Sequence, residues 1–120
     1  MKNFLSIVGI AAMAIGLSAA EDIKTLLDAT NYTGIVKQAS ELLSAAKTNS
    51  NQAAKSTVIN GIIFARLKVG TYKTSAEAIT DLESMMRDIG YTRDNASWAR
   101  IYIYEKFNEF ENEIHYEIYH

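Results

Sequence analysis

The sequence contains no cysteine and no proline, and only six of its 120 residues are glycine. Without cysteine, neither a disulfide bond nor a thiolate nucleophile is possible, so packing alone must hold the fold together. Without proline, the strongest helix-breaking residue is missing, which favours a mostly helical chain. Hydrophobic residues make up 48% of the sequence, and this is enough for a packed core.

A concentration of positive charge is also missing. The formal net charge is −2, and the lysines and arginines between Lys24 and Lys106 are scattered along the chain. Nucleic-acid binding requires a basic face that contacts several phosphates at once. We therefore expect no nucleic-acid partner.

The sequence lacks the usual motifs of catalytic centres. No serine lies in a G-x-S-x-G turn, and no glycine-rich loop is present to hold a phosphate. Glu111 and His115 are four residues apart, which would place two metal ligands on one helical face. The same spacing is ordinary on a solvated helix surface, so we expect no enzyme, no metal site and no cofactor.

The first 20 residues have the pattern of a secretory signal peptide. An apolar run from Phe4 to Leu17 follows Lys2 and ends at the small residues Ser18-Ala19-Ala20. Cleavage after Ala20 would leave residues 21–120, which is the usual size of one small domain. The sequence therefore predicts a secreted or periplasmic protein.

A retained membrane anchor is the alternative for this segment. The apolar run of 14 residues is shorter than the roughly 20 residues that cross a bilayer as a helix. Contact with a membrane is expected only if residues 1–20 are retained.

Apolar residues recur at helical spacing through the rest of the chain, separated by polar or glycine-containing breaks. The third helical segment is apolar around most of its surface, so we expect it to be central and the most buried. Gly70 and Gly90 lie where left-handed C-caps would end two of the helices. The expected helices cover residues 22–29, 35–47, 52–69 and 75–89, with a last one from about residue 96 to the C-terminus.

One part of this pattern resembles a known repeat. The segment from Phe64 to Tyr72, followed by a second apolar helix, is similar to the hairpin of a tetratricopeptide repeat. In that family, small residues in both helices and an aromatic residue after the turn allow close packing, and Ala65, Tyr72 and Ala76 would take these roles. The resemblance covers residues 53–89, and residues 22–47 in part. It implies a concave surface that binds a protein or peptide.

The sequence thus predicts an all-α fold of four to five antiparallel amphipathic helices after an N-terminal signal helix. The helices could form a generic bundle or a short tetratricopeptide-like array. Tyr32, Tyr72 and Phe110 are spaced by 40 and 38 residues, whereas the repeat has 34. A bundle explains the same alternation of helices and breaks without any repeat.

Aromatic residues are unusually dense in the last helical segment. Tyrosine and tryptophan are enriched at interfaces because they bury apolar area while keeping a polar tip. Packing at the edge of the core is the alternative explanation for these residues. The predicted partner-binding residues are Tyr72, Trp98, Tyr102, Tyr104, Phe107, Tyr116 and Tyr119.

Our hypothesis from the sequence is an exported, non-catalytic adaptor or scaffold that binds a protein or peptide. One alternative is a small inhibitor or immunity-type protein, in which the acidic stretch from Glu105 to Glu117 would block the basic cleft of an exported enzyme. Another is a membrane-tethered structural subunit, which requires the N-terminal helix to be retained.

Overall fold

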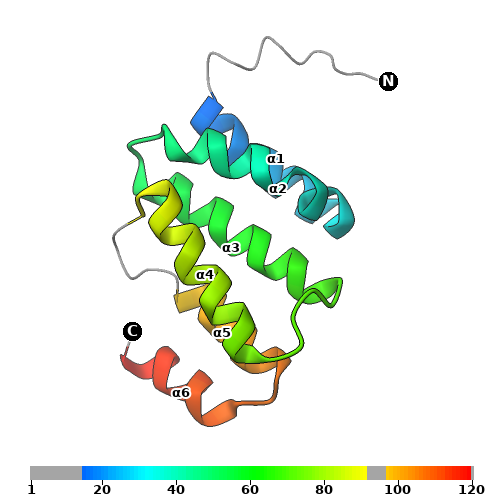
Figure 1. Cartoon of the computed structure of the whole chain (residues 1–120), viewed down its shortest axis with the longest axis vertical. Helices are drawn as coiled ribbons and strands as arrows, with labels where there is room; N and C mark the ends of the chain where they lie inside the picture. The colour runs from blue at the N-terminus through cyan, green and yellow to red at the C-terminus, as the bar shows by residue number, and fades with distance from the viewer. Residues whose placement is uncertain (1–14, 92–96, 120) are drawn as a thin grey trace.

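The computed structural model describes residues 15–91 and 97–119, with side chains for residues 19–91 and 98–115. These residues form six helices and no strand (Figure 1). The expected all-α class is confirmed, whereas the expected number of four to five helices is too low. The helices are α1 (Ile15–Asp28), α2 (Tyr32–Lys47), α3 (Gln52–Lys68), α4 (Ser75–Ile89), α5 (Ser97–Lys106) and α6 (Phe110–Tyr119).

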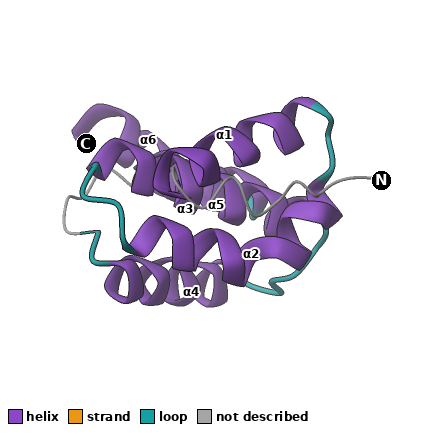
Figure 2. Cartoon of the chain, turned by 90° about the horizontal axis from the view of Figure 1, so that it is seen from above, coloured by secondary structure: helices purple, strands orange, loops and turns teal. Residues whose placement is uncertain are grey.

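Helix α3 is the centre of the molecule, as its apolar pattern predicts. It contacts α1, α2, α4 and α5. Figure 2 shows α2 and α4 together on one side of α3, with α1 on the other. Burial on several sides explains why this helix has no clean polar face. Its fully buried side chains include Val58, Ile59, Ile62 and Ile63.

Four of the helices end in the same way, with one residue in the left-handed conformation. Gly70 (φ 77°) and Gly90 (φ 71°) follow α3 and α4, which confirms both predicted C-caps. In each case the next amide reaches back to a carbonyl five residues earlier, as in Thr71 N–H to Arg66 O at 2.9 Å. Thr30 and Asn108 take the same role after α1 and α5, with φ values of 51° and 59°.

The end of α5 at Asn108 corrects one prediction. A single helix was expected from about residue 96 to the C-terminus, but the Glu109 N–H donates to Tyr104 O at 2.7 Å and closes α5 there. Asparagine tolerates the left-handed conformation better than most residues, so it can end a helix without glycine. The chain then restarts as α6, and the Ser75 hydroxyl donates to Glu109 at 2.6 Å, which ties this turn to the start of α4.

Short polar side chains begin the central helices. Asn31 accepts from the Gly34 N–H at 3.0 Å, Asn51 from the Ala53 N–H at 2.9 Å, and Thr74 from the Glu77 N–H at 3.2 Å. Each oxygen satisfies an amide that has no partner within the first helical turn. The polar breaks in the sequence therefore mark the helix starts correctly.

A buried lysine joins two helix ends to α3. Lys55 is only 6% exposed, and its ammonium group donates to Ile89 O at the end of α4 and to Lys47 O, at 3.4 Å, at the end of α2. The last carbonyls of a helix lack partners within the helix and carry partial negative charge. Lys55 therefore holds α2 and α4 on the same side of α3.

The predicted cleavage site lies within α1. Residues 1–14 lie outside the described part of the chain, while Ala19 and Ala20 are buried at the beginning of the domain. Ala19 and Ala20 precede the predicted cleavage site, whereas the fully buried Ile23 follows it. Within residues 15–91 and 97–119, no helix combines the length and the apolar character needed to cross a membrane.

Helix α1 approaches α3 closely at Gly61. A Cβ atom at this position would overlap Ile23 Cγ2 and would stand 3.0 Å from Ile23 Cδ1. Ile23 is fully buried, so it has little room to move away. Glycine in the middle of a helix weakens that helix, and here the close approach of α1 explains its presence.

We expect Gly61→Ala to lower the free energy of unfolding by about 1–2 kcal/mol, because overpacking outweighs the gain in helix propensity. Urea unfolding followed by circular dichroism measures this change. In an Ile23→Ala background the same substitution should cost nothing, because the added methyl group then fills vacated space. An equal loss in both backgrounds would contradict the proposed contact.

Candidate functional site

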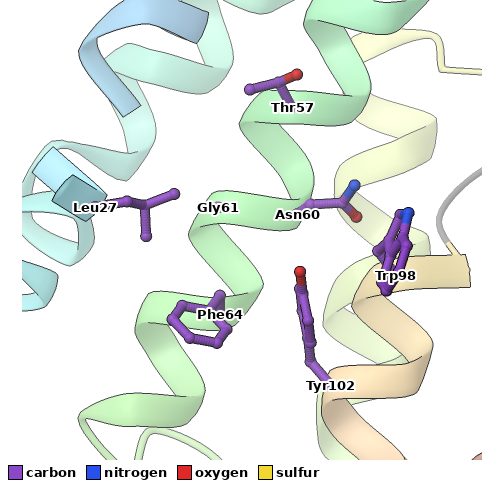
Figure 3. A pocket seen from close by; sticks show the side chains of 7 residues that line it. All are labelled: Leu27, Thr57, Asn60, Gly61, Phe64, Trp98 and Tyr102. Carbon is purple, nitrogen blue, oxygen red and sulfur yellow. The ribbon is translucent and has the colours of Figure 1, made fainter. Parts of the chain in front are cut away.

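A groove runs between α1 and α5, with α3 as its floor. Both α1 and α5 pack on α3, but within the described residues they do not contact each other. The groove has a volume of about 330 Å³, and Figure 3 shows its side chains coming from all three helices. We call it the aromatic groove, and its lining residues are Leu27, Thr57, Asn60, Gly61, Phe64, Trp98 and Tyr102.

Aromatic rings form a continuous series across this face. Phe64 lies between Tyr32 and Tyr102, with ring centroids 5.8 Å and 5.1 Å away and edge-to-face geometry in both pairs. Tyr102 in turn lies 6.3 Å from Trp98. Such pairs stabilise one another beyond the area they bury, so the rings hold a defined arrangement. Trp98 ends the series and is 59% exposed.

A smaller hollow of about 180 Å³ adjoins the groove near the ends of α3 and α5. Phe64 and Tyr102 line both spaces, and the smaller one adds Leu67, Lys68, Glu105 and Lys106. The Lys68 ammonium group lies 5.2 Å from the centre of the Phe64 ring, which is within the range of a cation–π interaction. One end of the groove is therefore cationic.

Asn60 gives the other part of the groove a polar group. Its Nδ2 donates to the Ser56 hydroxyl at 3.2 Å, while its buried Oδ1 has no hydrogen-bond partner among the described residues. Figure 3 shows the Asn60 side chain extending from α3 toward Trp98. The groove lining thus includes an amide in addition to the hydroxyl of Thr57.

A further hollow, of about 450 Å³, lies between α4 and α5. It is lined by Glu83, Arg87 and Arg100 together with Met86 and Tyr91. Glu83 and Arg100 form an ion pair at 3.7 Å, so their opposite charges are balanced within the chain. The one aromatic residue that lines this hollow, Tyr91, is buried, so the hollow lacks an exposed series of rings like that of the aromatic groove.

The structure brings together two of the residues predicted to bind a partner. Trp98 and Tyr102 are neighbours in the aromatic groove. Tyr104 and Phe107 are half-buried and pack against the core, as the alternative of core-edge packing predicts. Tyr116 and Tyr119 belong to α6, and their side chains lie outside the described part of the structure.

Tyr72 lies apart from the groove and is held by a hydrogen bond. Its hydroxyl donates to Asp81 Oδ2, and the same oxygen accepts from Arg66 Nη1 at 2.6 Å. The three side chains join the turn after α3 to both α3 and α4. Burial, followed by the hydrogen bond to Asp81 and its negative charge, raises the pKa of Tyr72 well above its usual value.

We expect Tyr72→Phe to lower the free energy of unfolding at pH 7 by about 1–2 kcal/mol. The folded-state pKa of Tyr72 lies above the unfolded value, so this contribution is complete below about pH 10 and declines as the pH rises further. The stability difference between the two proteins, measured by urea unfolding, should therefore stay constant up to about pH 10 and shrink as the pH is raised further. A difference that stays constant, or one that persists fully in an Asp81→Ala background, would count against the bond.

The three residues that carry the tetratricopeptide resemblance differ in how deeply they are buried. Ala65 is buried in α3, Tyr72 is half-buried after the turn, and Ala76 is exposed on α4. Ala78 is the small residue that α4 buries.

Several groove residues were not among those predicted from the sequence. These residues are Leu27, Asn60 and Phe64. The apolar pattern of their helices predicts that the helices are buried, but it does not show which residues line a groove. The signal for Phe64 is its position as the one aromatic residue in α3, which is otherwise aliphatic and polar.

Neither a protein-family model, a curated protein nor a solved structure matches this chain. Among the described side chains, no three histidine, aspartate or glutamate residues lie close enough together to hold a metal ion. The geometry of the aromatic groove is therefore the basis for assigning a function.

Proposed function

We propose that this chain is an exported, non-catalytic helical domain that binds a protein or peptide partner in the aromatic groove. The observation that carries the proposal is the position of Trp98, which is 59% exposed at the end of a packed ring series. Exposed tryptophan beside tyrosine is the composition of interface hot spots, because both rings bury a large area on rigid side chains.

The chemistry of the lining residues supports binding rather than catalysis. The side chains around the 330 Å³ space are apolar, aromatic, hydroxyl or amide groups, and none is a carboxylate, histidine or cysteine. A general acid–base pair needs titratable groups within hydrogen-bond reach of a substrate. A tetratricopeptide-like hairpin, which we propose for α3 and α4 from their sequence pattern, would serve the same kind of function.

A second candidate function rests on α6. Within the described part of the chain this helix contacts only α5, and it exposes Phe110 (55%) and Ile114 (53%) beside Glu111. An acidic, partly apolar surface of this kind suits an inhibitor that covers the basic cleft of an exported enzyme. This candidate predicts that contacts with the partner centre on Phe110 and not on Trp98.

Crosslinking in the producing cell separates the two candidates. With the photoreactive residue p-benzoylphenylalanine in place of Trp98, we expect a discrete adduct with one partner, identified by mass spectrometry. The same residue in place of Phe110, which is similarly exposed, is the matched control and should give none. An adduct only from position 110 would favour the inhibitor, and no adduct from either position would contradict the groove as a binding site.

With the partner identified, Trp98→Ala should weaken its binding at least tenfold, as expected for a hot spot. The free energy of unfolding should change by less than about 1 kcal/mol because the side chain is largely exposed. Calorimetric titration and urea unfolding measure the two effects separately. Equal binding by the variant would exclude Trp98 from the interface.

Export is the other part of the proposal, and it is supported by the pattern of residues 2–20. We expect the intact mass of the protein made in its host to correspond to a chain that begins at Glu21, because the small residues Ser18 and Ala20 suit signal peptidase. A chain that begins at Met1 and is recovered with membranes would instead favour the tethered structural subunit.

A further inference from the structure

The aromatic groove has two chemically different ends. At one end, Leu27 and Trp98 face each other across Gly61 (Figure 3). At the other end, Phe64 and Tyr102 also line the smaller hollow, which is bordered by Lys68 and Lys106 at the last positions of α3 and α5. A partner that lies along the groove therefore meets an apolar region first and a cationic region next.

The two lysines are available for an external charge. Within the described residues, neither forms an ion pair with a carboxylate, and Lys68 instead lies over the Phe64 ring. Glu105 is the one acidic residue that lines the smaller hollow, so the formal balance of the lining is two positive charges against one negative. This excess is local, because the whole chain carries a net charge of −2.

Resting on the proposed function, we propose that the partner is a peptide segment that carries a carboxylate next to its apolar anchor. The anchor lies against Trp98, Tyr102 and Phe64, and the carboxylate lies between Lys68 and Lys106. Complementary charge at the rim of an interface orients the partner and suppresses binding in the reverse direction. The groove would thus distinguish acidic from basic segments of equal hydrophobicity.

Selection from a random dodecapeptide display library on the full chain tests this proposal, with the Trp98→Ala variant as counter-selection. We expect the recovered peptides to place Asp or Glu within a few residues of Trp, Phe or Leu. Trp98 is the only tryptophan in the chain, so its fluorescence follows binding of synthetic versions that contain no tryptophan.

In a second experiment, the charges of two lysines at a time are reversed by substitution with glutamate. Lys68→Glu with Lys106→Glu should weaken an acidic peptide about tenfold and strengthen its Glu→Lys counterpart, because two rim contacts become repulsive. Lys37→Glu with Lys73→Glu makes the same change in net charge at exposed positions that line neither hollow, and should alter affinity less than twofold. If the reversed pair unfolds, Lys68→Gln with Lys106→Gln should still weaken binding about threefold.

The outcomes separate the inference from the proposed function. Peptides that depend on Trp98 but are basic or uncharged would overturn the acidic partner and leave the groove as a binding site. Equal effects of the two reversed pairs would also overturn it, since net charge alone would then explain the change. Recovery of no Trp98-dependent peptide would overturn both proposals, as would binding of dodecanoate in the groove when no peptide binds.

Discussion

The close approach of α1 to α3 at Gly61 is the constraint on which the rest of the structure depends. Because Gly61 has no side chain, Ile23 can fill the space beside α3 and bring α1 against it. Gly61 also lines the aromatic groove, so the contact that brings α1 against α3 lies directly beside the candidate site.

The opposite side of α3 is organised by a polar contact. Lys55 lies almost fully inside the protein, where an ammonium group without partners would be very unfavourable. The ammonium group of Lys55 donates hydrogen bonds to the carbonyls of Lys47 and Ile89. Both bonds can form only because the ends of α2 and α4 lie near each other. Helices α1 and α5 also pack on α3 but do not contact each other within the described residues, and the groove lies between them.

The sequence predicts helices well here because their ends carry local signals. Asn51, Thr74, Gly70 and Gly90 act through bonds to residues only a few positions away. Asn108 was missed because asparagine is also tolerated within a helix, and the apolar spacing continues across it. The site was only partly predictable. Aromatic density points to Trp98 and Tyr102, but nothing local shows that Phe64 packs against Tyr102 or that Tyr72 bonds to Asp81 outside the groove.

The difference between α5 and α6 is the reason that we propose the groove, and not α6, as the binding site. Helix α5 packs on both α3 and α4, with Ala99 and Ile103 fully buried, so Trp98 is exposed on a helix that is itself fixed. A partner meets rings already held by their neighbours and pays little for ordering them. In the described part of the chain, α6 contacts α5 alone, so Phe110 and Ile114 depend on a single neighbour for their position. Trp98 and Phe110 are similarly exposed, so the packing of the helix that carries each residue is what distinguishes the two surfaces.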